Sequence, residues 1–498
     1  MVTDYDRQCI DDIVKKTGIA NEIAEMYYIQ NNKQLEGTLK SIYENYGKLD
    51  KMKEDYFAFS HIIFQNPILN EPLNMRIEYL KYLTTCFEKA KWDNEKYIKA
   101  QLQFYEKILL DDKVKEVNKQ KINLEKYQYF LLIDICHILG FDKKKIKSKQ
   151  MNDIIQNLMK DFSDLLLYKF RLLMSYLIDS GVDFEYWNYK YNFIKEKNYI
   201  QICKQNYQFS RKKPFTLLVT ATMSAGKSTL INGIMGENIS LAQNMATTDK
   251  IHKIIGKAFD DGYAYEYDHE LVLMATKEEL LEDNKENKSD TILVGAYYKG
   301  LLGGERVVIH DSPGVNFSGK DAHKQITNDL IKQRDNYDLL LYVMNASQLG
   351  TNDEKEHLDY VKSQIGNKQI VFVINKIDVF NPEEEDVEQI IEGQRQYLVK
   401  CGFHNPIILP ISAKAAYLAR TLNEENLPRS KRREFDNLIY LFEIMNLQNY
   451  YKKYFPQITI PDSTNDKEQL LKNSGFLYME TIIKNKLNNK RKNKRRTI

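Results

Sequence analysis

The stretch Phe215–Leu230, FTLLVTATMSAGKSTL, decides the fold of this 498-residue chain. Phe215–Val219 is a short, mostly apolar run after Pro214, which indicates a buried β-strand. Small and polar residues follow, then Gly226-Lys227-Ser228-Thr229, and then a helical pattern that begins at Leu230. In a strand, tight loop and helix N-terminus, unpaired backbone N–H groups and the positive helix end face an anion. The stretch therefore predicts a phosphate-binding loop.

The residues of this loop have separate expected roles. Lys227 is expected to reach the β- and γ-phosphates, and the Ser228 hydroxyl is expected to ligate Mg²⁺. The remaining predicted nucleotide-binding residues of the loop are Ala225, Gly226 and Thr229. The strict pattern has a glycine five residues before Gly226, where this chain has Ala221.

A second motif, Asp311-Ser312-Pro313-Gly314, follows the apolar run Val307–Ile309 and His310. An aspartate at a strand end can hold Mg²⁺ through a water molecule, so Asp311 is a candidate metal ligand. The N–H of Gly314 can sense a γ-phosphate, because glycine permits a close backbone approach.

Two further motifs point to the base. The apolar run Ile370–Ile374 ends in Asn375-Lys376-Ile377-Asp378. A carboxylate at Asp378 can accept two hydrogen bonds from guanine N1 and N2, a donor pair that adenine lacks. The run Ile407–Ile411 precedes Ser412-Ala413-Lys414, in which the Ala413 N–H could meet guanine O6. Four motifs in this order, each at the end of an apolar strand, predict that the chain binds GTP or GDP.

The loop Ser224–Thr229, followed by Leu230-Ile231-Asn232 and Gly236, resembles the dynamin superfamily, and bacterial dynamin-like proteins in particular. The resemblance covers roughly Pro214–Leu418. It implies a GTPase, and it implies that Ser224 helps to hold a monovalent cation, K⁺ or Na⁺, beside the phosphates. It also implies that a threonine in the loop Glu237–Lys250 completes the Mg²⁺ shell. Thr248 is favoured for this role, and Thr247 is the alternative. The implied catalytic set is Ser224, Lys227, Thr248 and Gly314.

The chain also departs from its relatives. The catalytic glutamine of eukaryotic dynamins falls at Met223, and Val315 stands where Ras-like proteins carry their water-orienting glutamine. Both departures fit a GTPase that completes its site by dimerisation of the GTPase domain, as dynamin relatives do.

The sequence predicts three regions. Residues 1–210 contain two of the ten prolines and five of the 21 glycines, which favours a helical region. In 211–420, continuous apolar runs alternate with helical patterns, which is typical of an α/β domain with a mostly parallel sheet covered on both faces. Residues 421–498 are again helical in pattern. We expect them to pack on the N-terminal helices, so that one bundle is built from both chain ends.

Composition limits the location and the partners. Net charge is only +3, but 484–498 holds eight Lys or Arg and no acidic residue. This basic tail has three readings: a disordered solvated end, a contact with an anionic membrane surface, and a contact with nucleic acid, which is the least favoured. Five scattered cysteines indicate reduced thiols and a cytoplasmic protein. The longest apolar region, Tyr129–Phe141, is too short to span a bilayer, so any membrane contact is expected to be peripheral.

Two functions follow. The first is a Mg²⁺-dependent GTP hydrolase whose nucleotide state drives self-assembly or movement of a helical stalk. The alternative is a slow GTP-gated switch that recruits a partner with little turnover. The sequence leaves membrane remodelling, a defence role and a chromosome-linked role open.

Overall fold

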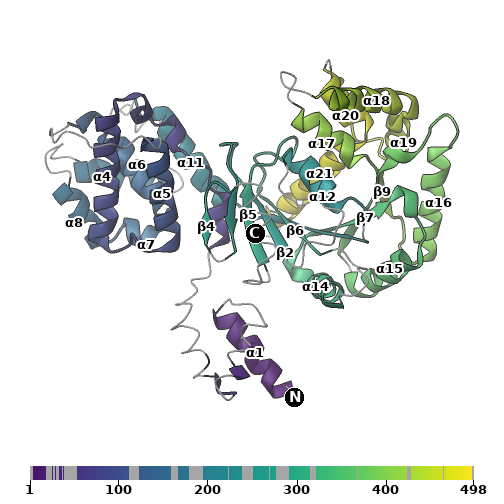
Figure 1. The fold of residues 1–498 in the computed structure, drawn as a ribbon, viewed down its shortest axis with the longest axis horizontal. Coiled ribbons are helices and arrows are strands. Elements are labelled where there is room, and N and C mark those ends of the chain that lie inside the picture. Colours follow the sequence, from purple (N-terminus) through teal and green to yellow (C-terminus); the bar gives the residue numbers. More distant parts are fainter. Residues whose placement is uncertain are drawn as a thin grey trace.

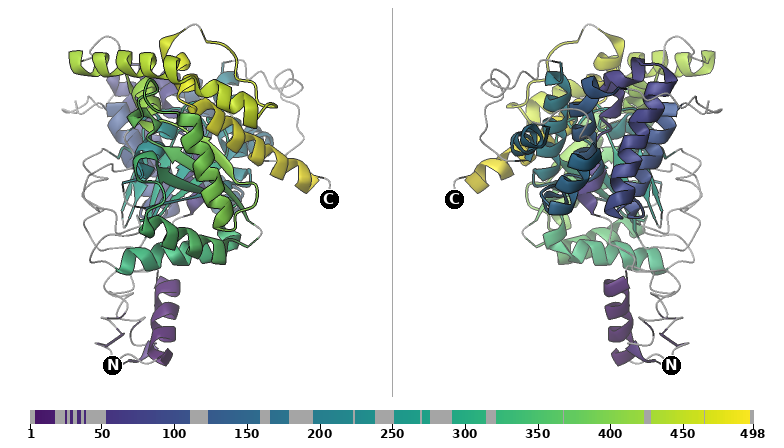
Figure 2. Two further views of the ribbon diagram at one scale, coloured as in Figure 1. Left: turned by 90° about the vertical axis from the view of Figure 1, so that its right-hand side faces the viewer. Right: turned by 90° about the vertical axis from the view of Figure 1, so that its left-hand side faces the viewer.

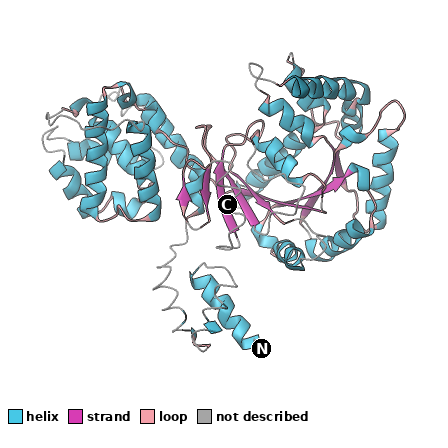
Figure 3. Cartoon of the chain, in the orientation of Figure 1, coloured by secondary structure: helices cyan, strands magenta, loops and turns pink. Residues whose placement is uncertain are grey.

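The structure is a computed structural model. It describes residues 4–17, isolated residues between 25 and 38, 53–110, 123–158, 166–178, 195–222, 224–237, 251–275 except 269, 291–313, 321–422 except 367, and 428–495 except 464. Figure 3 shows a separate group of helices on one side and, on the other, a sheet with helices around it.

The described residues form one nine-stranded sheet with the order β4-β3-β5-β2-β6-β1-β7-β8-β9. Its strands are β1 Phe215–Ala221, β2 Ile251–Gly256, β3 Tyr265–Tyr267, β4 Leu271–Val272, β5 Thr291–Ala296, β6 Val307–Asp311, β7 Leu339–Asn345, β8 Gln369–Asn375 and β9 Ile407–Pro410.

The strand that precedes the phosphate loop lies in the parallel half of the sheet. β1 pairs in parallel with β6 on one side and β7 on the other, and β7, β8 and β9 continue in parallel. Every residue of β7 is buried, as expected for a strand covered on both faces. Helix α12 (Lys227–Met235) packs against one face of β1, and α14 (Asp321–Lys332) packs against β1 as well (Figure 1). The predicted α/β fold with a mostly parallel sheet is confirmed.

The remaining helices of this domain flank the same strands. They are α15 Asn352–Ile365, α16 Val387–Lys400 and α17 Ala413–Thr421.

The N-terminal region is helical, as predicted. Beyond α1 (Asp4–Thr17), its helices share one hydrophobic core, and α11 leads directly into β1. These helices are α4 Leu73–Ala90, α5 Lys96–Leu110, α6 Gln128–Ile138, α7 Lys143–Ile146, α8 Lys149–Leu158, α9 Leu166–Ile178 and α11 Lys197–Arg211.

The N-terminal core continues onto the sheet. A short 3₁₀ helix, η1 (Glu54–Ala58), lies against β5 and β2. A Cβ atom on Gly295 of β5 would come within 2.6 Å of the Phe57 carbonyl oxygen, so only glycine permits this approach. Ile255 and Leu293 of the sheet belong to the same hydrophobic core as the helices. The helical region therefore already buries its apolar surface against the β2–β5 part of the sheet.

The C-terminal helices correct one prediction. They are α18 Arg429–Met445, α19 Leu447–Tyr454, α20 Asp466–Asn473 and α21 Phe476–Arg495. Their buried side chains belong to the hydrophobic core of the α/β domain and not to that of the N-terminal helices. Figure 1 shows α18 to α20 on the side of the sheet opposite to α4–α8. The expected bundle built from both chain ends is therefore wrong, although both ends are helical.

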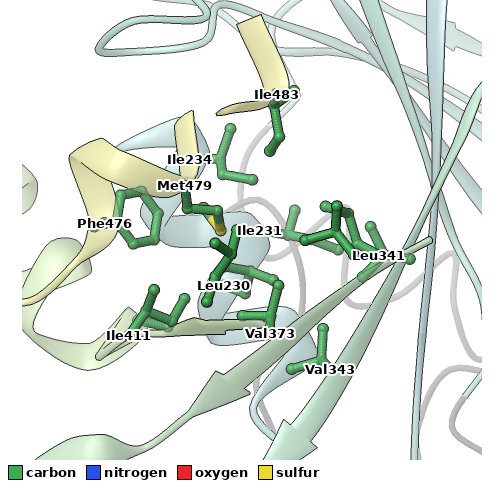
Figure 4. Packing of buried hydrophobic residues seen from close by; sticks show 14 of the residues in the cluster. Leu230, Ile231, Ile234, Leu341, Val343, Val373, Ile411, Phe476, Met479 and Ile483 are labelled. Atoms are coloured by element: carbon green, nitrogen blue, oxygen red, sulfur yellow. The ribbon is translucent and has the colours of Figure 1, made fainter. Parts of the chain in front are cut away.

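The partner of α21 is the helix that follows the phosphate loop. Phe476, Met479 and Ile483 lie over α12, close to Ile231 and Ile234 (Figure 4). A Cβ atom on Gly233 of α12 would come within 3.1 Å of the Phe476 ring, so the two helices approach closely.

A buried ion pair fixes the same helices. Arg420 at the end of α17 donates two hydrogen bonds of 2.8 Å to the Glu480 carboxylate on α21. Arg420 also donates to the Gly233 carbonyl oxygen at 2.6 Å. Because Arg420 and Glu480 are both buried, each needs the other as a partner for its charge.

The structure also contradicts one of the three interpretations of the basic tail. Residues 484–495 continue α21 as a helix, so a disordered end is wrong for them. Lys490 forms an ion pair with Asp338, and Arg491 forms one with Glu305 at 2.7 Å. Asp338 precedes β7 and Glu305 precedes β6, so the tail crosses the amino ends of the strands. It lies at the edge of the sheet opposite to the phosphate loop.

We expect Phe476→Ala to lower the free energy of unfolding of the α/β domain by about 3–5 kcal/mol, because it leaves a cavity over α12. Chemical denaturation followed by far-UV circular dichroism measures this. Val399→Ala, an exposed position on α16, is the matched control and should change stability by less than about 0.5 kcal/mol. Equal stabilities of Phe476→Ala and the parent would contradict the packing described here.

Candidate nucleotide-binding site

The phosphate loop is a sharp turn between β1 and α12. Ser224 and Gly226 both have positive φ, 60° and 82°. A Cβ atom on Gly226 would lie 2.4 Å from Asn375 Nδ2, so only glycine fits here. The turn brings the N-terminus of α12, with its unpaired backbone N–H groups, to the carboxyl edge of the parallel strands. This is the position at which an anion is stabilised.

Lys227 and Asp311 meet at this edge. The Lys227 ammonium contacts the Asp311 carboxylate directly, and both side chains are buried. Ser312 donates its hydroxyl to the Val219 carbonyl oxygen at 2.9 Å, which fixes the chain after β6 to β1. The two residues predicted to face the phosphates and Mg²⁺ are thus brought together.

The motif after β8 is joined to the phosphate loop by Asn375. Its Nδ2 donates to the Ala225 carbonyl oxygen at 2.9 Å, and its Oδ1 accepts from the Ala413 N–H at 2.9 Å. One buried amide therefore holds the phosphate loop and the loop after β9 in register. Lys376 adopts φ 65°, which turns the chain between Asn375 and Asp378.

The predicted base-binding residues also lie together. The Ser412 hydroxyl donates to Asp378 Oδ1 at 2.5 Å and accepts from the Ala415 N–H at 3.1 Å as the N-cap of α17. Ser412 therefore fixes one oxygen of the Asp378 carboxylate. Lys414, on the first turn of α17, forms a 2.9 Å ion pair with Glu434 of α18.

A residue that the sequence analysis missed supports the same loop. Asn345 ends β7 and pairs in register with Asn375 on β8. Its Nδ2 donates to the Ser224 carbonyl oxygen at 3.3 Å, and its Oδ1 accepts from the Ser347 N–H at 3.1 Å. Two neighbouring asparagines thus hold consecutive carbonyls of the phosphate loop. The signal was an asparagine at the end of an apolar strand, the same context as Asn375.

We expect Asn345→Asp to weaken GTP binding about fivefold, because the loop loses one hydrogen-bond donor to Ser224, worth about 1 kcal/mol. The aspartate retains the acceptor for Ser347, but it loses the Nδ2 contacts with both Ser224 and Gln348 Oε1 and adds a negative charge beside the loop. Titration with a fluorescent GTP analogue measures the affinity. Gln348→Ala, on the same turn, is the control and should bind as the parent does. Parental affinity in Asn345→Asp would show that this contact does not shape the site.

Two predicted residues, Thr248 and Gly314, lie outside the described residues, as do Thr247, Met223 and Val315. Their roles stay predictions. The part of the chain that the structure describes has no group of three or more His, Cys, Asp or Glu side chains placed to hold a metal ion. Ser228 and Asp311 offer oxygen ligands from α12 and the end of β6. A magnesium ion bound by few protein oxygens and by phosphates fits such a pair.

Burial shifts the pKa of three groups beside the loop strands. Burial lowers the pKa of His310, before Asp311, to about 4, and that of His357 to about 4. His357 Nε2 lies 2.9 Å from the Thr220 hydroxyl of β1. Burial raises the pKa of Glu354 to about 7, although its carboxylate accepts a 2.7 Å hydrogen bond from the Gly350 N–H. Neither histidine is expected to carry charge at neutral pH.

We expect stability to depend on pH through Glu354. Its pKa is about 4.5 when unfolded and about 7 when folded, so folding favours the protonated carboxyl. The stabilising contribution is complete below pH 4.5 and is lost as pH rises through 7, with a size of about 3 kcal/mol. Unfolding curves at several pH values measure this, with Glu354→Gln expected to flatten the dependence between pH 5 and 8. An unchanged pH profile in Glu354→Gln would assign the dependence to another group.

None of the helices in the described part of the chain is long and apolar enough to cross a membrane.

Comparison with known proteins gives a match to one family over part of the chain. The model of the dynamin family matches residues 217–377. An uncharacterised protein from the xynA 3′ region of Caldicellulosiruptor sp. is 30% identical over 231 residues, which cover 44% of this chain and 54% of that protein. The probable transmembrane GTPase FZO-like, chloroplastic, of Arabidopsis thaliana is 25% identical over 213 residues, which cover 42% of this chain and 20% of that protein. The chain thus spans about half, or less, of the length of these relatives.

Among solved structures, an oligomerised bacterial dynamin pair, described as a mechanism for long-range sensing and tethering of membranes, is similar. It has 16% sequence identity and a TM-score of 0.33, and the match covers 89% of this chain and 63% of that one.

The matched residues 217–377 begin in β1, end just after Asn375-Lys376, and include both Lys227 and Asp311. The family match and the interlocked loops thus concern the same residues, and the domain that these residues form is similar to the dynamin family.

Proposed function

We propose that this chain binds GTP with Mg²⁺ and hydrolyses it to GDP and phosphate. The observation that carries the proposal is the contact of Asn375 with both Ala225 and Ala413, because it joins the predicted phosphate and base sites into one unit.

In this proposal the chain's own residues divide the work. Lys227 and the N–H groups of 225–229 neutralise charge on the β- and γ-phosphates. Asp378, held by Ser412, accepts hydrogen bonds from guanine, and the Ala413 N–H donates to guanine O6. Lys376 and Lys414 flank the base.

Ser228 and Asp311 would hold Mg²⁺, with Thr248 as the further ligand. When bound, Mg²⁺ offsets negative charge on the phosphates. Since Lys227 contacts Asp311 directly, nucleotide and metal binding requires these two side chains to separate. Ser224 would assist at the phosphates with a monovalent cation, and Gly314 would report the γ-phosphate.

The proposal includes self-assembly, because Met223 and Val315 replace the glutamines that orient water in other GTPases. A second GTPase domain would then complete the site, and the nucleotide state would drive assembly or movement of the helical region. Asn345 and Asn375 donate hydrogen bonds to the phosphate loop and tie it to β7 and β8. A change in the bound nucleotide would therefore act on a loop that is fixed to the sheet.

GTPase rate against protein concentration tests this proposal. A specific activity that rises with concentration supports hydrolysis stimulated by assembly. A flat, near-zero rate with intact GTP binding would favour the slow GTP-gated switch. Lys227→Ala is the background control, because any activity remaining in it comes from a contaminant.

A peripheral contact of this cytoplasmic protein with anionic membranes is a further part of the proposal. It rests on the basic residues of 484–498 other than Lys490 and Arg491, which form ion pairs with the domain. Co-sedimentation with liposomes that contain anionic lipid, with and without a non-hydrolysed GTP analogue, tests it. Equal sedimentation with neutral liposomes would count against it.

A further inference from the structure

Helix α18 carries an exposed face that the domain does not cover. Arg433, Asn437, Tyr440 and Ile444 recur at helical spacing and are all exposed. Tyr440 is 63% exposed and Ile444 is 39% exposed, which places both among the few large apolar side chains at the described surface. Figure 2 shows the C-terminal helices along the outer edge of the α/β domain.

A hollow of about 460 Å³ lies beside the C-terminal end of this face. Its lining is mixed and includes the loop between β8 and α16, which is acidic from Glu383 to Asp386. The apolar and aromatic side chains of the lining include Val387, Ile391, Met445, Leu447 and Tyr450. Glu383 and Glu384 have no ion-pair partner among the described residues.

The N-terminal end of the same helix has the opposite charge. Arg429, Arg432 and Arg433 are exposed, and within the described ranges none of them forms an ion pair. Helix α18 therefore presents a basic end, an exposed Tyr440 in its middle and a partly acidic hollow beside its other end. A rise of about 1.5 Å per residue separates Arg433 from Ile444 by about 16 Å.

We propose that the occupant of this surface is a second copy of the chain, with its α18 antiparallel across a two-fold axis. The arginines of each copy then lie at the acidic loop of the other, and Tyr440 lies near the axis against its own counterpart. Such an isologous contact makes every interaction twice, and so it closes as a dimer.

This contact goes beyond the proposed function, because it uses none of the predicted nucleotide-binding residues and does not require GTP. One helix face buries a small area, and exposed ion pairs are weak and screened by salt. The dimer is therefore weak and salt-sensitive, and it forms at protein concentrations on the order of 0.1 mM.

Charge exchange tests the pairing. Sedimentation equilibrium is measured for Arg432→Glu/Arg433→Glu and for Glu383→Lys/Glu384→Lys, each alone and then mixed. Each variant alone should be at least about tenfold weaker in dimerisation than the parent. An equimolar mixture should recover the dimer, because in the mixed dimer one contact keeps its native arginines and glutamates and the other has the two charges exchanged. A mixture that stays monomeric overturns the proposed pairing.

Cross-linking tests the position of the axis. In a Cys401→Ser background, Tyr440→Cys should form a disulfide-linked dimer on mild oxidation, since the other native cysteines are buried. Val399→Cys, 47% exposed on α16, is the matched control and should not link. No link at position 440, or equal linking at 399, overturns the proposal. GTP affinity measured on the same variants should equal that of the parent, so failure of this inference is distinguishable from failure of the proposed function.

Discussion

Lys227→Ala is expected to weaken GTP binding at least about 100-fold, which corresponds to about 3 kcal/mol. Lys227 is the first residue of α12, so its ammonium group belongs to the helix N-terminus, where the phosphates are expected. Without it, no ammonium group offsets the negative charge of the β- and γ-phosphates next to the Asp311 carboxylate. Titration with a fluorescent GTP analogue measures the loss.

The control must separate lost binding from lost folding, because Lys227→Ala leaves the buried Asp311 carboxylate without its partner. The double variant Lys227→Ala/Asp311→Asn removes both charges and should recover much of the melting temperature while still failing to bind. Lys253→Ala on β2, which removes an ion pair with Glu54 of η1, should bind as the parent does. GTP affinity within threefold of the parent in Lys227→Ala would remove the central claim.

The site could be predicted because each motif occupies the end of an apolar strand. Parallel strands bring their carboxyl ends to one edge of a sheet, so Lys227, Asp311 and Asp378 had to meet if the runs were parallel strands. The hydrogen bonds that hold the loops were harder to predict from the sequence. Asn375 belongs to a known motif, whereas Asn345 has the same geometry without one.

The position of the C-terminal helices could not be predicted in this way. Phe476, Met479 and Ile483 recur at helical spacing, which indicates one apolar face but not the surface that it covers. That surface is α12, whose Gly233 permits the Phe476 ring to approach. The basic tail could not be placed from the sequence either. Its composition suggests a solvated segment, whereas Leu487 is buried and Lys490 forms an ion pair with Asp338.

Asp378→Asn is expected to change base specificity. GTP binding should weaken about 100-fold, because a carboxamide offers one acceptor oxygen where guanine N1 and N2 need two. Xanthosine triphosphate should bind better than in the parent, since the carboxamide N–H₂ can donate to the extra carbonyl of xanthine. Competition of each triphosphate against a fluorescent GDP analogue measures both affinities.

The structure indicates that Asp378→Asn changes the contact with the base without changing the loop. Ser412 donates its hydroxyl to Asp378 Oδ1, and the asparagine oxygen can accept the same hydrogen bond, so the loop should keep its shape. Asp386→Asn is the matched control, because Asp386 follows the same strand and caps α16 by accepting from the Gln389 N–H, a role that asparagine also fills. Ser412→Ala should instead weaken GTP binding without improving xanthosine triphosphate, since it frees the Asp378 carboxylate but leaves it an acceptor. If the parent bound ATP and GTP equally, or if Asp378→Asn left their ratio unchanged, Asp378 would not read the base.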